Sequence, residues 1–191
     1  GRVNRATGKR EGGIIGLTST QEAAARAARD ELASGDAALL RNYLTRERRD
    51  RRFDRSVASA IREGRPVPAA IVASATDRYR ARLLELRGST IARTEALASL
   101  HAARQEAYLQ AVEDGKVAEA DIRRVWQSAG DSRVRHTHAI LHGKSAGLRE
   151  PFRSASGAML MFPGDPSAPA SETINCRCGI RYDVDFLAGI R

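Results

Sequence analysis

The 191-residue chain changes character near residue 120, and this change limits what it can fold into. Before that point, residues 20–114 are rich in Ala, Leu, Arg and Glu and poor in β-branched residues, a composition that favours helices. From Gly130 onward, glycine and proline recur every few residues, a density typical of turns between short strands and loops. We therefore expect an α+β protein whose N-terminal two-thirds is mainly helical and whose small C-terminal tail is mixed.

Apolar spacing and helix-ending residues predict four helices, over residues 21–34, 36–64, 69–87 and 89–114. Ser19 precedes Glu22 at capping-box spacing, so the first helix is expected to begin there. Gly88 is expected to end the third helix, and Ser89 to cap the fourth. In the tail, residues 122–128 could form a strand or a short helix, and residues 158–162 and 179–184 are candidate strands.

These patterns divide the chain into a basic arm (1–18), a helical region (19–118) and an α+β segment (119–191). The arm has little periodicity, so we expect it to be flexible unless a partner binds it. The chain begins with Gly1 rather than methionine, as processed or partial chains do. No run approaches the roughly 18 apolar residues of a membrane helix, so no membrane partner is expected.

The charge balance favours a polyanionic partner. Lys and Arg number 32 against 23 Asp and Glu, a net charge of +9, and all but three of these cations are arginines. Arginine suits bidentate contacts to phosphate or carboxylate, although a general bias toward Arg and Ala would give the same composition. The densest run supplies the candidate nucleic-acid or portal contacts Arg46, Arg48, Arg49, Arg51, Arg52 and Arg55. Its interleaved acids equally allow ion pairs along a solvated helix.

Histidines and cysteines gather in two short stretches of the tail. On a helix, His138 and His142 would be i,i+4 neighbours, and in a strand Cys176 and Cys178 would point to the same face. Two histidines and two cysteines make a tetrahedral zinc set, and the basic surroundings favour thiolates. These four residues are therefore candidate ligands of a structural zinc ion. The alternative is a pair of free thiols, because a disulfide between residues two apart would be strained.

A catalytic set is harder to find. A cysteine, a histidine and Asp131 occur in the tail, but no nucleophile elbow or phosphate-binding glycine loop accompanies them. The carboxylates that a metal-dependent nuclease would cluster are scattered in sequence. We therefore expect no catalytic residue and no certain cofactor.

The order of the tail residues resembles the phage Mu F-like head morphogenesis family. A tryptophan, a D-x-R segment, a histidine and a glycine are followed by a closing N-C-R-C, and an R-T-E helix segment lies upstream. The resemblance covers about residues 85–185. Its matched positions are Arg93, Glu95, Trp126, Asp131, Arg133, Arg135, His138, Gly143, Asn175, Cys176, Arg177 and Cys178.

The resemblance implies a non-enzymatic minor head protein. Its expected partners are the portal protein, the major capsid protein and double-stranded DNA bound without sequence preference. Its expected location is the capsid interior or portal vertex of the virion, and the host cytoplasm during assembly. The alternative is a phage-delivered metal-dependent hydrolase, nuclease or transferase toxin. We also expect Arg93 and Glu95 to pair with Asp131 or Arg133 and so to dock the tail on the helices.

Overall fold

The computed structural model describes residues 2–3, 10–11, 16–186 and 188. It divides into two compact units, residues 1–89 (unit 1) and 90–191 (unit 2), and the long helix α4 contributes to both. The α+β class predicted from the sequence is confirmed. Most of the predicted basic arm lies outside the described residues, apart from a short antiparallel pair of β1 (Arg2–Val3) and β2 (Arg10–Glu11). None of the described helices contains an apolar stretch that could cross a bilayer.

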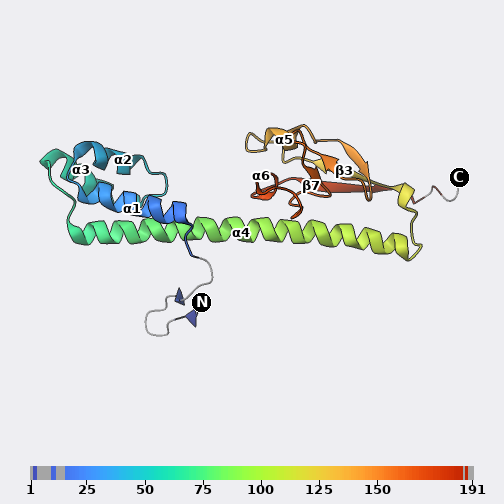
Figure 1. Ribbon diagram of the computed structural model, residues 1–191, viewed down its shortest axis with the longest axis horizontal. Coiled ribbons are helices and arrows are strands. Elements are labelled where there is room, and N and C mark those ends of the chain that lie inside the picture. Colours follow the sequence, from blue (N-terminus) through green and yellow to red (C-terminus); the bar gives the residue numbers. More distant parts are fainter. Residues whose placement is uncertain (1, 4–9, 12–15, 187, 189–191) are drawn as a thin grey trace. The chain divides into compact units, whose positions relative to one another are not determined.

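Unit 1 is helical. It contains α1 (Ser19–Ala33), α2 (Ala37–Thr45), the 3-10 turn η1 (Arg51–Phe53), α3 (Asp54–Glu63) and the first half of α4 (Ala69–Glu113) (Figure 1). Each helix contributes apolar side chains to one core, whose largest fully buried members are Leu32, Leu40, Tyr43 and Val57. Burial of this shared face, rather than helix propensity alone, holds short helices of this kind in place.

The first two helices are capped at their N-termini by side-chain oxygens, which accept hydrogen bonds from backbone N–H groups that have no partner within the helix. The predicted capping box of Ser19 and Glu22 is wrong by one residue. Thr18 Oγ1 instead accepts from Gln21 N at 3.2 Å, and Gln21 Oε1 accepts from Thr18 N at 3.1 Å. Asp36 caps α2 as predicted, accepting from two backbone N–H groups at 2.7 and 2.9 Å.

The predicted second helix, over residues 36–64, is interrupted. The backbone leaves the helical region at Arg46 (ψ 115°), and the chain becomes helical again only at η1 and α3. The sequence has no apolar residue between Leu44 and Phe53, so a continuous helix there would have no face to bury. Buried Asp50 begins the new segment, because its carboxylate accepts from Arg52 N at 3.1 Å.

The predicted third and fourth helices are one helix, α4, so the predicted stop at Gly88 is wrong. Gly88 does not adopt the left-handed conformation that ends a helix, in contrast to Gly64, which ends α3 with φ 61°. One interior glycine costs a helix only about 1 kcal/mol relative to alanine, too little to stop a run of strong helix formers.

Replacing Gly88 by alanine should therefore raise the free energy of unfolding by about 0.5–1 kcal/mol. No atom outside its own helix lies within 4 Å of the added Cβ, so no clash opposes the gain. Thermal unfolding followed by far-UV circular dichroism measures the change. Gly64→Ala is the matched control, and it should destabilise because alanine is strained at positive φ. A loss of stability in Gly88→Ala would contradict a continuous helix at this position.

Unit 2 combines the second half of α4 with a small sheet. After η2 (Glu119–Asp121), strand β3 (Ile122–Gln127) pairs antiparallel with both β4 (Ser145–Gly147) and β7 (Gly179–Val184), giving the order β4-β3-β7. Strands β5 (Phe152–Arg153) and β6 (Met159–Leu160) form a separate antiparallel pair. The predicted strand 179–184 is confirmed. Residues 122–127, for which the sequence left strand and helix open, form a strand. Of the predicted strand 158–162, two residues, 159 and 160, are in a strand.

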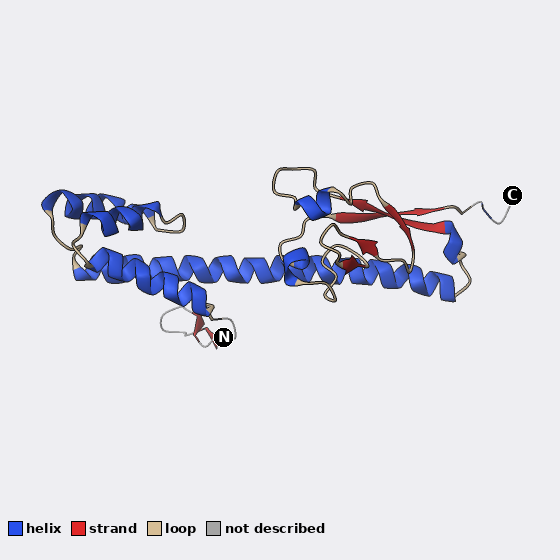
Figure 2. Cartoon of the chain, turned by 45° about the horizontal axis from the view of Figure 1, so that its top comes forward, coloured by secondary structure: helices blue, strands red, loops and turns tan. Residues whose placement is uncertain are grey.

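The sheet lies against the second half of α4, as Figure 2 shows. From this helix, Gln105 Nε2 donates to Leu148 O at 2.7 Å, and Tyr108 stacks on Tyr182 of β7 with ring centroids 4.2 Å apart. Two one-turn helices, α5 (His136–Ala139) and α6 (Ala170–Thr173), lie in the connections around the sheet. The core of unit 2 is centred on Trp126 and includes both cysteines. The second half of α4 therefore supplies the support that the sparse tail lacks by itself.

Candidate functional site

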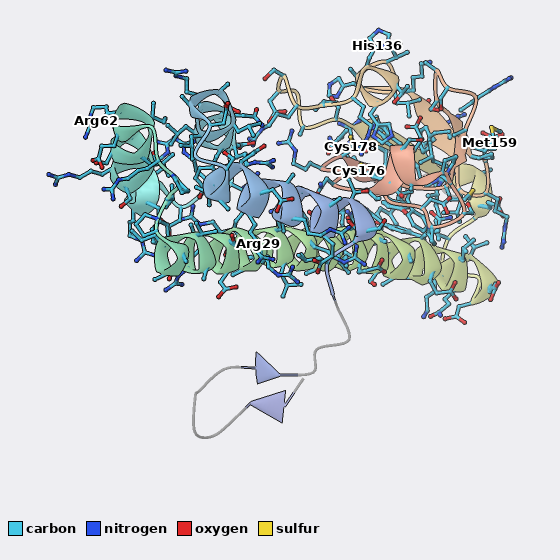
Figure 3. The ribbon with its side chains drawn as sticks, turned by 60° about the vertical axis from the view of Figure 1, so that its left-hand side comes forward. Arg29, Arg62, His136, Met159, Cys176 and Cys178 are labelled. Carbon is cyan, nitrogen blue, oxygen red and sulfur yellow. The ribbon has the colours of Figure 1, made fainter. Side chains whose placement is uncertain are left out.

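The core of unit 2 brings together one histidine and both cysteines. His138 Nδ1 lies 3.4 Å from Cys176 Sγ and 3.6 Å from Cys178 Sγ, and all three side chains are buried. The histidine comes from α5, and the cysteines come from the loop between α6 and β7. Figure 3 shows the two cysteines close together. Of the four predicted metal ligands, the structure thus gathers three, whose ligand atoms lie within 4.8 Å of one another.

A buried carboxylate holds the other side of the imidazole. Glu172 Oε2 lies 2.8 Å from His138 Nε2, and the same oxygen accepts from Thr137 Oγ1 at 3.1 Å. Its second oxygen accepts from Ser156 Oγ at 2.5 Å. Burial raises the pKa of Glu172, but the hydrogen bonds from Ser156 and Thr137, together with His138, outweigh it and lower the pKa overall. The carboxylate therefore stays ionised, and its oxygen 2.8 Å from Nε2 favours the tautomer of the imidazole with the proton on that nitrogen.

The two thiols are chemically different. A hydrogen bond from Cys176 lowers the pKa of Cys178 to about 7, and the Trp126 side chain and Arg135 act in the same direction. The same hydrogen bond, together with burial, raises the pKa of Cys176 to about 12. Trp126 Nε1 is buried and has no geometrically acceptable partner among the described residues, so this donor adds positive potential beside the thiol. The arrangement favours one thiolate, at Cys178.

The structure does not bring His142 to this cluster. Helix α5 ends at Ala139, so the i,i+4 geometry that would align His138 with His142 is absent. His142 is exposed, and its Nδ1 accepts a hydrogen bond from Ser128 N at 3.2 Å. His136 is also exposed, at the surface of unit 2 (Figure 3). Glu172, which the sequence analysis did not name as a candidate ligand, lies instead at Nε2 of His138, on the opposite side of the ring from the cysteines.

The remaining motif residues join the loop after β3 to the N-C-R-C loop. Arg177 forms a two-pronged ion pair with Asp131, one contact of which is 2.7 Å, and this pair lowers the pKa of Asp131 to about 2. Arg135 donates to the carbonyl of Ile174. Arg133 lies 3.9 Å from Asp131, at the margin of an ion pair. These contacts close one loop on the other, and no substrate is needed to satisfy them.

Two motif residues, Gly143 and Asn175, have a backbone conformation that few residue types adopt. Gly143 has φ 77°, and its N–H donates to Trp126 O at 2.9 Å. Among the residues that the structure describes, Asn175 is the one non-glycine residue with a positive φ, 56°. Asparagine tolerates this conformation better than most residues, and here it turns the chain so that Cys176 enters the core. These positions explain a glycine and an asparagine without any catalytic role.

The R-T-E segment of α4 contacts the tail through its threonine rather than its charges. Arg93 and Glu95 are exposed and have no ion-pair partner among the described side chains, so the expected pairing with Asp131 or Arg133 is wrong. Instead Thr94 Oγ1 accepts from Asn175 N at 3.1 Å. Asp131 is occupied by Arg177, which sits only two residues from the asparagine in sequence.

Arg124 is a central residue that the sequence analysis missed. Its side chain is 0% exposed, and its guanidinium donates to Gly147 O at 2.7 and 2.9 Å and to the carbonyls of Glu150 and Met161. The signal was the strand alternation of residues 122–127, which places residue 124 on the same buried face as Ile122 and Trp126. The arginine thus ties β3 to three separate carbonyl groups of the loops around it.

The arginine run of unit 1 is largely paired within the protein. Arg46 forms a bidentate ion pair with Glu31, at 2.6 and 2.8 Å, and Arg49 pairs likewise with Asp54. Arg52 pairs with Asp50 at 2.6 Å. Arg48 lies 3.6 Å from Glu47. Two arginines of the run, Arg51 and Arg55, are exposed and carry no ion pair to any described side chain. Four of the six predicted contact arginines therefore form ion pairs within the described part of the protein, and three of these pairs are also hydrogen-bonded.

The pairing of Asp50 predicts an acid-sensitive step in unit 1. The Arg52 hydrogen bonds lower the pKa of buried Asp50 from 3.8 to about 2, with a smaller contribution from Arg82. A lowered folded-state pKa means that the carboxylate stabilises the fold above about pH 4 and that this stabilisation is lost as the pH falls toward 2. Asp50→Asn should remove this part of the pH profile and lower stability at neutral pH by about 1–3 kcal/mol. Urea unfolding at several pH values, followed by circular dichroism, measures both effects, and exposed Asp30→Asn is the control. An Asp50→Asn profile that matches wild type would contradict the ion-pair geometry.

Comparison with known proteins finds one matching family model and similar phage and bacterial proteins. The sequence model of the family described as Phage Mu protein F like protein matches residues 51–181. An uncharacterised protein, YqbB, of Bacillus subtilis (strain 168) is 34% identical over 102 residues, covering 52% of this chain and 31% of that protein. The minor head protein GP7 of Bacillus phage SPP1 is 34% identical over 65 residues, covering 34% of this chain and 21% of that protein.

The chain thus spans about a third of one of these relatives and about a fifth of the other. No solved structure matches the chain. The matched region runs from the arginine run to strand β7 and contains the buried His138 cluster, the loops that close around it and Arg124. The chain belongs to the phage Mu protein F-like family.

Proposed function

We propose that the protein is a structural minor component of a tailed-phage head. The observation that carries the proposal is the family match over residues 51–181, together with the similarity to a protein named as a minor head protein. The proposed location is the virion, either in the capsid interior or at the portal vertex, with the host cytoplasm as the site of assembly.

The geometry of unit 2 supports a structural role. The charged motif residues that face the tail loops satisfy one another, as in the pair of Arg177 and Asp131. The cavity beside His138 and Cys178 measures about 10 Å³, whereas sites for small-molecule substrates are typically about 300–1,000 Å³. Larger cavities, of about 330 and 610 Å³, lie in unit 1 and contain none of the motif residues of the tail. A hydrolase or transferase role would need substrate room beside the motif.

The proposed partners are the portal protein, the major capsid protein and packaged double-stranded DNA. For DNA, the support is the net charge of +9 and a set of exposed arginines without an ion-pair partner among the described side chains. In unit 1 this set comprises Arg26, Arg29, Arg41, Arg51, Arg55, Arg62 and Arg78 (two of them labelled in Figure 3). Exposed arginines that are not neutralised internally are free to replace phosphate counterions.

Fluorescence anisotropy with duplexes of two unrelated sequences tests the DNA contact. We expect equal affinities that fall steeply as salt is raised. The double variant Arg51→Gln/Arg55→Gln should weaken binding and reduce the salt slope more than Arg123→Gln/Arg153→Gln, which removes two exposed charges from unit 2. Equal losses would contradict a contact at the arginine run, and no binding at low salt would remove DNA from the proposal.

Affinity capture tests the protein partners. Tagged wild-type chain, mixed separately with the purified portal and major capsid proteins of the same phage, is expected to retain at least one of them. The same capture with the Arg124→Met variant, in which unit 2 is expected to be strongly destabilised, shows whether retention depends on a stable folded tail. Retention of neither protein would contradict the proposed partners.

A further inference from the structure

The hydrogen bonds of the buried His138 cluster are incomplete. The ionised carboxylate of Glu172 beside Nε2 favours the tautomer with the proton there, which leaves one lone pair on Nδ1. Two thiol groups nevertheless lie 3.4 and 3.6 Å from that one atom. A single lone pair accepts one S–H hydrogen bond well, and a thiolate at Cys178 has no proton to donate to it, so protons alone do not account for both contacts.

We propose that His138 Nδ1, Cys176 Sγ and Cys178 Sγ bind one zinc ion, and that Glu172 is a positioning residue that fixes the imidazole for it. Bond lengths of about 2.3 Å to sulfur and about 2.0 Å to nitrogen place nitrogen and sulfur ligands of a tetrahedral zinc ion about 3.5 Å apart. The two nitrogen-to-sulfur distances, 3.4 and 3.6 Å, match this spacing. Thiolate and imidazole ligands together favour zinc over magnesium or calcium, which prefer oxygen.

The surroundings suit an ion as well as the ligands do. A carboxylate on the far nitrogen of a ligating histidine is the usual outer partner of zinc, since it fixes the tautomer and makes the ligand more basic. Glu172 is itself held by Ser156 and Thr137, so the imidazole has little freedom to rotate. The Trp126 ring packs edge-on against His138, with centroids 5.2 Å apart, and shields the site on that side.

Three protein ligands leave one tetrahedral position for a water molecule. The cavity of about 10 Å³ borders His138 and Cys178, and this volume is close to the space that one water needs. Its other lining side chains include Arg133, Arg135 and Arg177. The ion would hold α5 and the N-C-R-C loop together, and it would replace the covalent staple that a tail of this size lacks.

The experiment begins with metal content. The full chain, carrying no histidine tag and purified under reducing conditions without chelator, should contain about one zinc ion per molecule by mass spectrometry of the elements. After exchange with Co²⁺ it should show the sulfur-to-cobalt charge-transfer absorption and visible bands of a tetrahedral thiolate site. The proposal is overturned if the folded wild-type chain contains no zinc and binds neither added zinc nor cobalt.

Variants assign the ligands. Cys176→Ser and Cys178→Ser should each weaken the charge-transfer absorption, and the double variant should abolish it; persistence in the double variant would overturn the assignment. His142→Ala is the matched control and should leave the metal content unchanged. Glu172→Gln should lower the zinc affinity by about 10–100-fold in competition with a chromophoric chelator. An unchanged affinity in a folded Glu172→Gln protein would overturn the positioning role. Because no outcome depends on phage heads, the metal site and the proposed function fail separately.

Discussion

Replacing Arg124 by methionine is expected to lower the free energy of unfolding of unit 2 by about 3–5 kcal/mol, because it leaves several buried acceptors unpaired. Methionine fills much of the space of the arginine stem but donates no hydrogen bond. The carbonyls of Gly147, Glu150 and Met161 would then be left without this donor inside the protein. Arg124→Lys should also destabilise, because one ammonium group cannot reach three carbonyls that a planar guanidinium spans.

Urea denaturation followed by tryptophan fluorescence measures this loss for unit 2 alone, because Trp126 is the single tryptophan of the chain. The matched control is Arg123→Met, one residue away on the exposed face of the same strand, and it should change stability by less than about 0.5 kcal/mol. If the Arg124→Met and Arg123→Met proteins unfold at the same urea concentration, Arg124 does not hold the loops as described.

Replacing Trp126 by alanine is expected to destabilise unit 2 by a similar amount, about 3–5 kcal/mol, for a different reason. The indole is fully buried and packs edge-on against Phe152 and His138, with centroids 5.3 and 5.2 Å away. Alanine would leave a cavity at the centre of the core that the short strands around it cannot close by collapsing.

Far-UV circular dichroism replaces fluorescence for this variant, since the reporter is lost. Trp126→Phe is the matched control: it keeps an aromatic ring at the core and should lose clearly less stability than Trp126→Ala. Equal losses in the two variants would indicate that the indole N–H, rather than the buried ring area, is what the core requires.

Local patterns predicted the fold where structure depends on neighbours in sequence. The alternation and turns around residues 179–184 gave strand β7, and the Asp36 cap gave the start of α2. Errors arose where a local signal was given too much or too little weight. The break between α2 and α3 follows from the lack of a face to bury, and the continuity of α4 through Gly88 follows from a glycine cost too small to end a helix.

The candidate site was predicted in part for the same reason. The cysteines were expected to point together because they are two residues apart, and His138 was expected to join them. His142 was expected through helical periodicity, but α5 is a single turn that ends before it. Glu172 reaches His138 across 34 residues of chain, and no local pattern indicates such a contact. Strand alternation alone would have placed Arg124 on the buried face, but charged residues are rarely buried, so its burial was not predicted.

The composition of purified particles tests whether the protein is a structural component of the phage head. Heads are purified from the phage or prophage that encodes the chain, filled heads are separated from empty ones, and each fraction is quantified by mass spectrometry against the portal and major capsid proteins. A structural component is expected to be present in both fractions at a fixed ratio to the portal protein. Absence of the chain from heads in which the portal and major capsid proteins are readily detected would contradict a structural role in the head.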